Sequence, residues 1–147
     1  MIKVKQITEV YENLKDDLNN FPFILIIGKY DHFLGPRTLF SSIPSRDDHF
    51  IRNLLRDALN SKLEYIFSDF GQFYSQTYKI EVENSNPKGG KQLYAIIILR
   101  DVKYPLITIL HFKRILKTFY NINHDKILFN DLTAFQSFFK EISNIYT

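Results

Sequence analysis

The amino-acid sequence predicts an α+β fold with a single five-stranded, mainly antiparallel sheet and helices on both of its faces. Two apolar runs of strand length, FPFILIIG and YAIIIL, are typical of central strands that are covered on both sides. Other segments show either helical spacing of apolar residues or alternation with period two. Their order is helix, two strands, helix, two or three strands and two helices, with hairpins joining neighbouring strands.

We expect one domain over residues 1–147, because one hydrophobic core can serve a chain of this length and no interdomain linker is apparent. The expected plan has an N-terminal helix over residues 1–20, the sheet with a central helix over residues 46–61 inside residues 21–104, and two helices over residues 105–147. The chain is 45% hydrophobic and 24% charged, as is ordinary for a globular protein.

The strands follow from short-range patterns. The apolar run at residues 23–29 predicts the first strand, and RTLFSSI predicts a second strand paired with it. Residues 73–82 alternate with period two, which predicts a strand in a hairpin with KQLYAIIILR. The segment Leu63–Phe67 fits either the end of a helix or a short additional strand. Beyond Pro105, apolar residues at helical spacing outline a helix; they are Leu106, Ile109, Leu110, Phe112, Leu116 and Phe119.

The composition excludes several kinds of chemistry. There is no cysteine, so the chain has no disulfide, no thiolate metal site and no cysteine nucleophile. The longest apolar runs are far shorter than the roughly 20 residues that span a bilayer, and the N-terminus has no apolar segment of signal-peptide type. We therefore expect a cytoplasmic protein, with peripheral attachment to membranes as an alternative location.

The sequence shows no enzyme motif. The four histidines do not occur in the H-x-x-x-H or H-E-x-x-H spacings of metal sites; they are His32, His49, His111 and His124. No G-x-S-x-G segment is present, and the serine pair Ser41–Ser42 has no obvious base. We therefore expect a non-enzymatic protein without catalytic residues, metal ions or cofactors.

Gly35 and Pro36 follow the first predicted strand and precede Arg37. The pair lacks the repeated glycines and the Lys-Ser/Thr of a phosphate-binding loop, and no helix start follows it. Glycine permits a positive φ and proline fixes the next φ, so a tight turn between two strands is the favoured interpretation.

The excess positive charge lies in the C-terminal third, where Lys113, Arg114 and Lys117 share a predicted helix. The solvated side of an amphipathic helix is the simplest interpretation. The functional alternatives are an acidic partner surface or anionic lipid headgroups. Nucleic acid is disfavoured because aromatic residues are not interleaved with these charges and the net charge is only +3.

The order of elements, with LGPRTLF at the first turn, resembles the longin domain, whose sheet and central helix are shared by the roadblock family. The local resemblance of Gly35–Phe40 is closest to folliculin and DENN-type longin domains. The resemblance covers nearly the whole chain. It implies a longin/roadblock/profilin-like sheet.

The resemblance also implies a function. Longin and roadblock domains pair with one another and serve as platforms for small GTPases in vesicle trafficking and signalling, so homodimers or heterodimers are expected. The open sheet edge supports this expectation, with Tyr74 and Tyr78 as candidate interface residues. Some longin assemblies supply an arginine that accelerates GTP hydrolysis, and Arg100 is the one candidate in the loop before Pro105.

Overall fold

The computed structural model describes residues 14, 16–31, 35–43, 49–83, 91–128 and 131–146. Its strands are β1 (Ile24–Asp31), β2 (Gly35–Ser41), β3 (Tyr65–Asp69), β4 (Phe73–Glu83) and β5 (Lys91–Asp101). Its helices are α2 (His49–Asn60), α3 (Ile109–Leu128) and α4 (Leu132–Tyr146), and residues 16–20 are also helical. The fold class expected from the sequence is thus confirmed as α+β.

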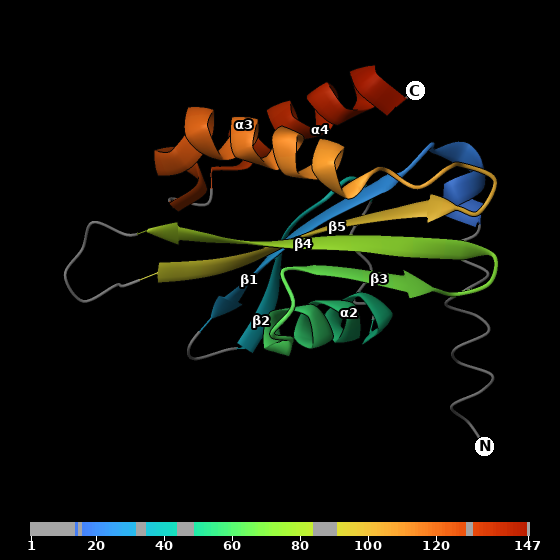
Figure 1. Cartoon of the computed structure of the whole chain (residues 1–147), viewed down its shortest axis with the longest axis horizontal. Helices are drawn as coiled ribbons and strands as arrows, with labels where there is room; N and C mark the ends of the chain where they lie inside the picture. The colour runs from blue at the N-terminus through green and yellow to red at the C-terminus, as the bar shows by residue number, and fades with distance from the viewer. Residues whose placement is uncertain are drawn as a thin grey trace.

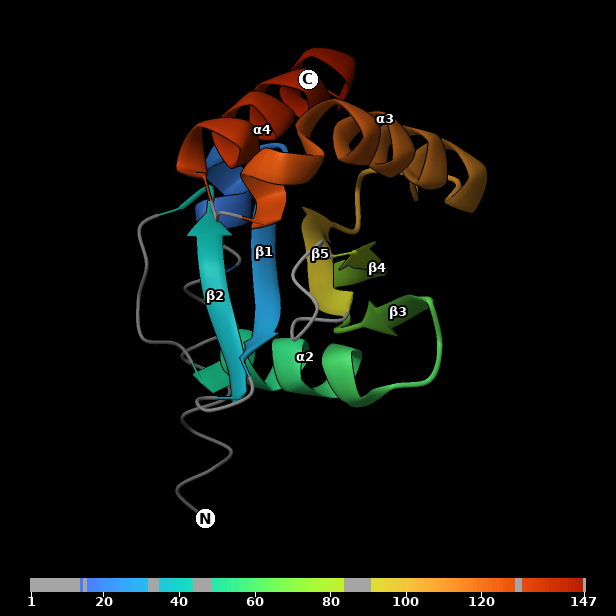
Figure 2. The same cartoon turned by 90° about the vertical axis from the view of Figure 1, so that its left-hand side faces the viewer.

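The five strands form one open sheet in the order β2-β1-β5-β4-β3, and each neighbouring pair is antiparallel. Helices α3 and α4 lie on one face of this sheet and α2 lies on the other (Figures 1 and 2). Because β2 and β3 are the two outer strands, α2 connects opposite edges of the sheet. Strands β1, β5 and β4 are interior strands.

Two hydrophobic clusters fill the spaces between these layers. On the α3 and α4 side, alternate residues of the central strands meet aromatic residues of the two helices, including Phe112, Phe119, Phe135 and Phe138. On the α2 side, the intervening strand residues meet Leu55 and Leu59, together with Leu14 and Leu18. A central strand therefore buries both of its faces, which explains the uninterrupted apolar runs of β1 and β5.

Strand β2 contains an irregularity that its weak alternation did not reveal. Ile27 pairs with Phe40, whereas Gly28 pairs with Thr38, so Leu39 is an extra residue in β2. Both Leu39 and Phe40 pack against the cluster on the α3 and α4 side. A β-bulge allows consecutive residues to contribute to one core in this way.

Several expected boundaries are refined by the structure. The segment with two interpretations, Leu63–Phe67, overlaps strand β3 and is not the end of a helix. Helix α2 begins at His49 among the described residues, since residues 44–48 lie outside them. Residues 1–13 and 15 of the expected N-terminal helix also lie outside the described residues.

Two helix starts are fixed by side-chain caps. The Thr108 hydroxyl accepts a hydrogen bond from the His111 backbone N–H at 3.2 Å, and α3 begins at Ile109. The Asp131 carboxylate accepts one from the Thr133 N–H at 2.9 Å before α4.

Among the described residues, no helix combines the length and apolar character required to cross a bilayer.

Candidate interaction surface

Three buried polar side chains of β4 and β5 form hydrogen bonds with the connection between β5 and α3. Gln76 donates to the Ile107 carbonyl at 2.7 Å and accepts from the Ile107 N–H at 3.1 Å. The Tyr74 hydroxyl lies 3.0 Å from the Pro105 carbonyl oxygen. The guanidinium of Arg100 donates to the same oxygen at 2.8 Å. This connection is therefore held in one conformation by the strands beneath it.

Arg100 has only 4% of its surface exposed, and its guanidinium lies 4.8 Å from the centroid of the Tyr104 ring. An arginine that acts on a partner's nucleotide has to project from the surface. Arg100 lies in strand β5 and not in the expected loop, and its guanidinium stabilises the connection that follows β5 through the Pro105 carbonyl. The burial argues against the role of a GTPase-facing arginine.

Tyr74 and Tyr78 are core residues and do not form an exposed interface, since 4% and 2% of their surfaces are exposed. The period-two pattern of β4 was confirmed, but β4 is an interior strand whose tyrosine face lies under α3. The Tyr78 ring packs 5.2 Å from Phe112. Burial raises the pKa of both hydroxyls, an effect that Arg100 partly offsets at Tyr74 and Lys113 partly offsets at Tyr78.

Gly35, Pro36 and Arg37 form the start of edge strand β2. Gly35 has a φ of 78° and pairs with Asp31, and residues 32–34 between the two strands lie outside the described residues. Proline and an exposed charge are features that discourage pairing of an edge strand with another chain. The Gly-Pro-Arg segment therefore protects the β2 edge.

The opposite edge has a different character. Beside β3, four large apolar side chains are 45–63% exposed, and we call them the β3-edge surface; they are Phe67, Leu106, Ile109 and Leu110. Phe67 pairs with Gln76 in the sheet, and the Gln76 amide forms hydrogen bonds with the Ile107 backbone. The loop and the start of α3 therefore lie beside the centre of β3. This places an apolar cluster next to an open strand edge.

Sequence reasoning missed the β3-edge surface. The apolar pattern predicted a helix that includes Leu106, Ile109 and Leu110, and α3 confirms this helix from Ile109 onward. The pattern did not indicate that these three side chains are exposed. The buried stripe of α3 begins at Phe112 and continues through Leu116 and Phe119. The first turn of α3 lies beyond this stripe. A surface helix buries only one of its sides. The pair of adjacent apolar residues was therefore the available signal that part of this segment is exposed.

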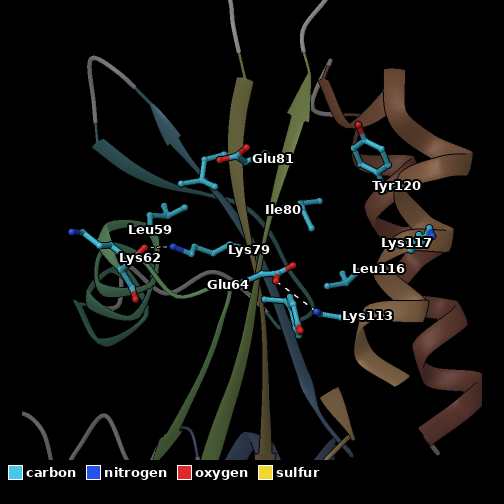
Figure 3. Close-up of a pocket in the computed structure, with 13 residues that line it drawn as sticks. Leu59, Lys62, Glu64, Lys79, Ile80, Glu81, Lys113, Leu116, Lys117 and Tyr120 are labelled. Carbon is cyan, nitrogen blue, oxygen red and sulfur yellow. Dashed lines mark hydrogen bonds and ion pairs between the residues drawn. The ribbon is translucent and has the colours of Figure 1, made fainter. Parts of the chain in front are cut away.

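The predicted basic residues are all exposed on α3, but they do not share one environment. Lys113 lies 3.7 Å from the Glu64 carboxylate, and its ammonium is 5.9 Å from the Tyr78 ring centroid. Lys113 and Lys117 line a groove of about 800 Å³ between α3 and the outer part of β4, whereas Arg114 does not (Figure 3).

We call this hollow the β4 groove, and its walls come from the end of α2, the connection between α2 and β3, and from β4, β5 and α3. Representative lining residues are Leu59, Lys62, Ile80, Leu116, Lys117 and Tyr120. Figure 3 shows Ile80, Leu116 and Tyr120 on the α3 side of the strands and Leu59 and Lys62 on the α2 side. The groove therefore follows the lateral edge of β4.

Within the described part of the chain, no cluster of three or more histidine and acidic side chains is arranged to hold a metal ion. Of the histidines considered from the sequence, His49 and His111 lie in α2 and α3. His32 lies outside the described residues, as does the side chain of His124.

The sequence was compared with protein-family models and with curated proteins. No family model matches the chain. No curated protein shows significant similarity to it.

Proposed function

We propose that this protein is a non-enzymatic interaction module of longin/roadblock type that dimerises and serves as a platform for small GTPases or for trafficking and signalling complexes. The observation that supports the proposal best is the β3-edge surface, where an outer strand lies beside exposed apolar side chains. A second longin-like domain is the natural occupant, because strand pairing and apolar contact are then satisfied together.

The two sheet edges differ in their suitability for pairing. The β2 edge carries Pro36 and the exposed Arg37, which oppose strand addition. The β3 edge carries Phe67 at its centre, with 45% of this side chain exposed. Large aromatic and aliphatic side chains are typical of the central part of protein interfaces. These features favour an interface through β3.

Introducing negative charge into the β3-edge surface tests the proposal. We expect the wild-type protein to be a dimer by size-exclusion chromatography with light scattering. The double variant Phe67→Asp/Leu110→Asp should be a monomer, because each aspartate would lose its hydration in the interface. Leu132→Asp is the matched control, since Leu132 is 53% exposed but begins α4.

The control variant should remain a dimer. Circular dichroism checks that each variant is folded. We expect both variants to fold, because the side chains that they replace are exposed. A wild-type protein that stays monomeric at all accessible concentrations contradicts the proposal. A dimer that persists in Phe67→Asp/Leu110→Asp contradicts the assignment of the interface to β3.

A further inference from the structure

The β4 groove begins where strand β3 stops covering its neighbour. The register between β3 and β4 runs from Asp69↔Tyr74 to Tyr65↔Tyr78. On the other side of β4, pairing with β5 continues as far as Glu83↔Lys91. The outer part of β4, from Ile80 to Glu83, is therefore an edge of the sheet although β4 is interior over its first half.

The backbone geometry of this segment is set by the last contact with the β3 side. The Lys79 N–H donates to the Glu64 carbonyl at 3.0 Å, and the chain then turns away toward α2. In an antiparallel ladder, alternate residues direct their backbone groups to the same neighbour. An added strand in line with β3 would thus extend the existing ladder along β4.

Apolar side chains lie on both sides of this edge. On the α3 side, Ile80 and Tyr120 accompany the buried Leu116, whereas Leu59 and Leu93 line the groove and belong to the cluster on the α2 side. A strand directs successive side chains to opposite faces. A peptide that pairs with β4 would therefore place alternate residues against each of these two walls.

The charged residues at the rim have a positive excess. Four lysines line the groove against two glutamates; they are Lys62, Lys79, Lys113 and Lys117 against Glu64 and Glu81. Lys113 pairs with Glu64, and the Lys79 ammonium is hydrogen-bonded to the Ser61 carbonyl (Figure 3). Lys62 and Lys117 form no ion pair with any described residue, and both are exposed.

From the uncovered strand edge, the two apolar walls and the positive rim, we propose that the β4 groove binds an extended, acidic peptide segment of a partner protein as an additional strand. The main-chain ladder supplies the binding mode, and Lys62 and Lys117 select acidic side chains. This site is separate from the β3-edge surface, so a dimer and a bound peptide are compatible.

The test uses the full chain and fluorescein-labelled eight-residue peptides with alternating sequence. The acidic probe alternates valine and glutamate, and the basic probe alternates valine and lysine. A third probe has the acidic sequence with N-methyl groups on alternate backbone nitrogens, which removes the donors on one edge. Binding is measured by fluorescence anisotropy. Physiological ionic strength is used because it largely screens interactions between exposed charges that are far apart.

We expect the acidic probe to bind at least tenfold more tightly than either of the other probes. The variant Lys62→Glu/Lys117→Glu should weaken binding of the acidic probe at least tenfold. Arg114→Glu/Lys140→Glu is the matched control, because it makes the same change in net charge with exposed residues that do not line the groove. It should bind within about threefold of the wild type, since distant charges are screened.

Several results would overturn the proposal. Equal binding of the acidic and basic probes removes the charge selection, and equal binding of the N-methylated probe removes strand pairing. Loss of binding in the control variant shows only general attraction to a basic surface. If vesicles of phosphatidylserine and phosphatidylcholine bind and no peptide does, the groove is a membrane contact instead. Phe67→Asp/Leu110→Asp should bind the acidic probe normally, which separates this result from the dimer test.

Discussion

Gln76 offers the most informative test of how the fold is held together. The residue is fully buried, with 0% of its surface exposed, and its amide forms three hydrogen bonds. Two of them satisfy the carbonyl and the N–H of Ile107, and the third joins the Tyr65 hydroxyl at 2.9 Å. Because Ile107 presents one donor and one acceptor, the orientation of the amide is fixed by chemistry.

The expected size of the effect follows from these contacts. Gln76→Met keeps a side chain of similar length but leaves both backbone groups of Ile107 without this partner. Ile107 is 5% exposed, and each buried backbone group that loses its hydrogen bond costs about 1–3 kcal/mol. We therefore expect the free energy of unfolding to fall by about 2–6 kcal/mol.

Gln92→Met is the matched control. The Gln92 amide donates a single hydrogen bond, 2.8 Å long, to the Tyr30 carbonyl, and the pair is only partly buried. Its loss should lower the free energy of unfolding by about 0.5–1.5 kcal/mol. Urea unfolding followed by far-ultraviolet circular dichroism measures both variants. Equal effects in the two variants would refute the argument that Gln76 fastens the connection between β5 and α3.

Two further predictions concern alkaline pH and the close approach of α2 to the sheet. Burial raises the pKa of Tyr94 to about 12 from 10.0, so its contribution to stability is intact below pH 10 and is lost as the pH rises to 12. The full loss is roughly 3 kcal/mol, and Tyr94→Phe should flatten this decline in unfolding experiments at pH 9–12; an unchanged slope would count against it. Gly28→Ala places a Cβ atom 2.5 Å from Leu55 Cδ2 and 2.9 Å from the Arg37 carbonyl oxygen, and should destabilise by about 1–3 kcal/mol. Gly35→Ala meets no atom within 4 Å and adds only backbone strain at φ 78°, about 1 kcal/mol, so a larger loss there than at Gly28 would contradict this reasoning.

Much of the architecture was predictable because it depends on neighbours along the chain. The alternation from Phe73 to Val82 predicted β4, since successive residues of a strand face opposite layers. The apolar runs of β1 and β5 predicted strands covered on both sides, and two buried clusters confirm this. Helical spacing predicted α2, α3 and α4 for the same local reason.

The candidate sites were less predictable. The sequence singled out Tyr74 and Tyr78 for an interface, yet their face of β4 lies under α3. It singled out Arg100 for a partner, yet Arg100 lies in β5 and its guanidinium donates a hydrogen bond to the Pro105 carbonyl of the same chain. Each outcome depends on which distant segment covers a side chain, and periodicity carries no information about that.

By itself, the sequence determined the kinds of elements and their order, because hydrophobic periodicity acts over one or two turns or a few strand residues. The tertiary structure alone decided that β2 and β3 are the outer strands and that β3 covers only half of β4. It also decided that Phe67 and the first apolar residues of α3 are exposed at the surface. Strand order and register are set by contacts between segments far apart in the chain, and these contacts create both proposed interaction surfaces.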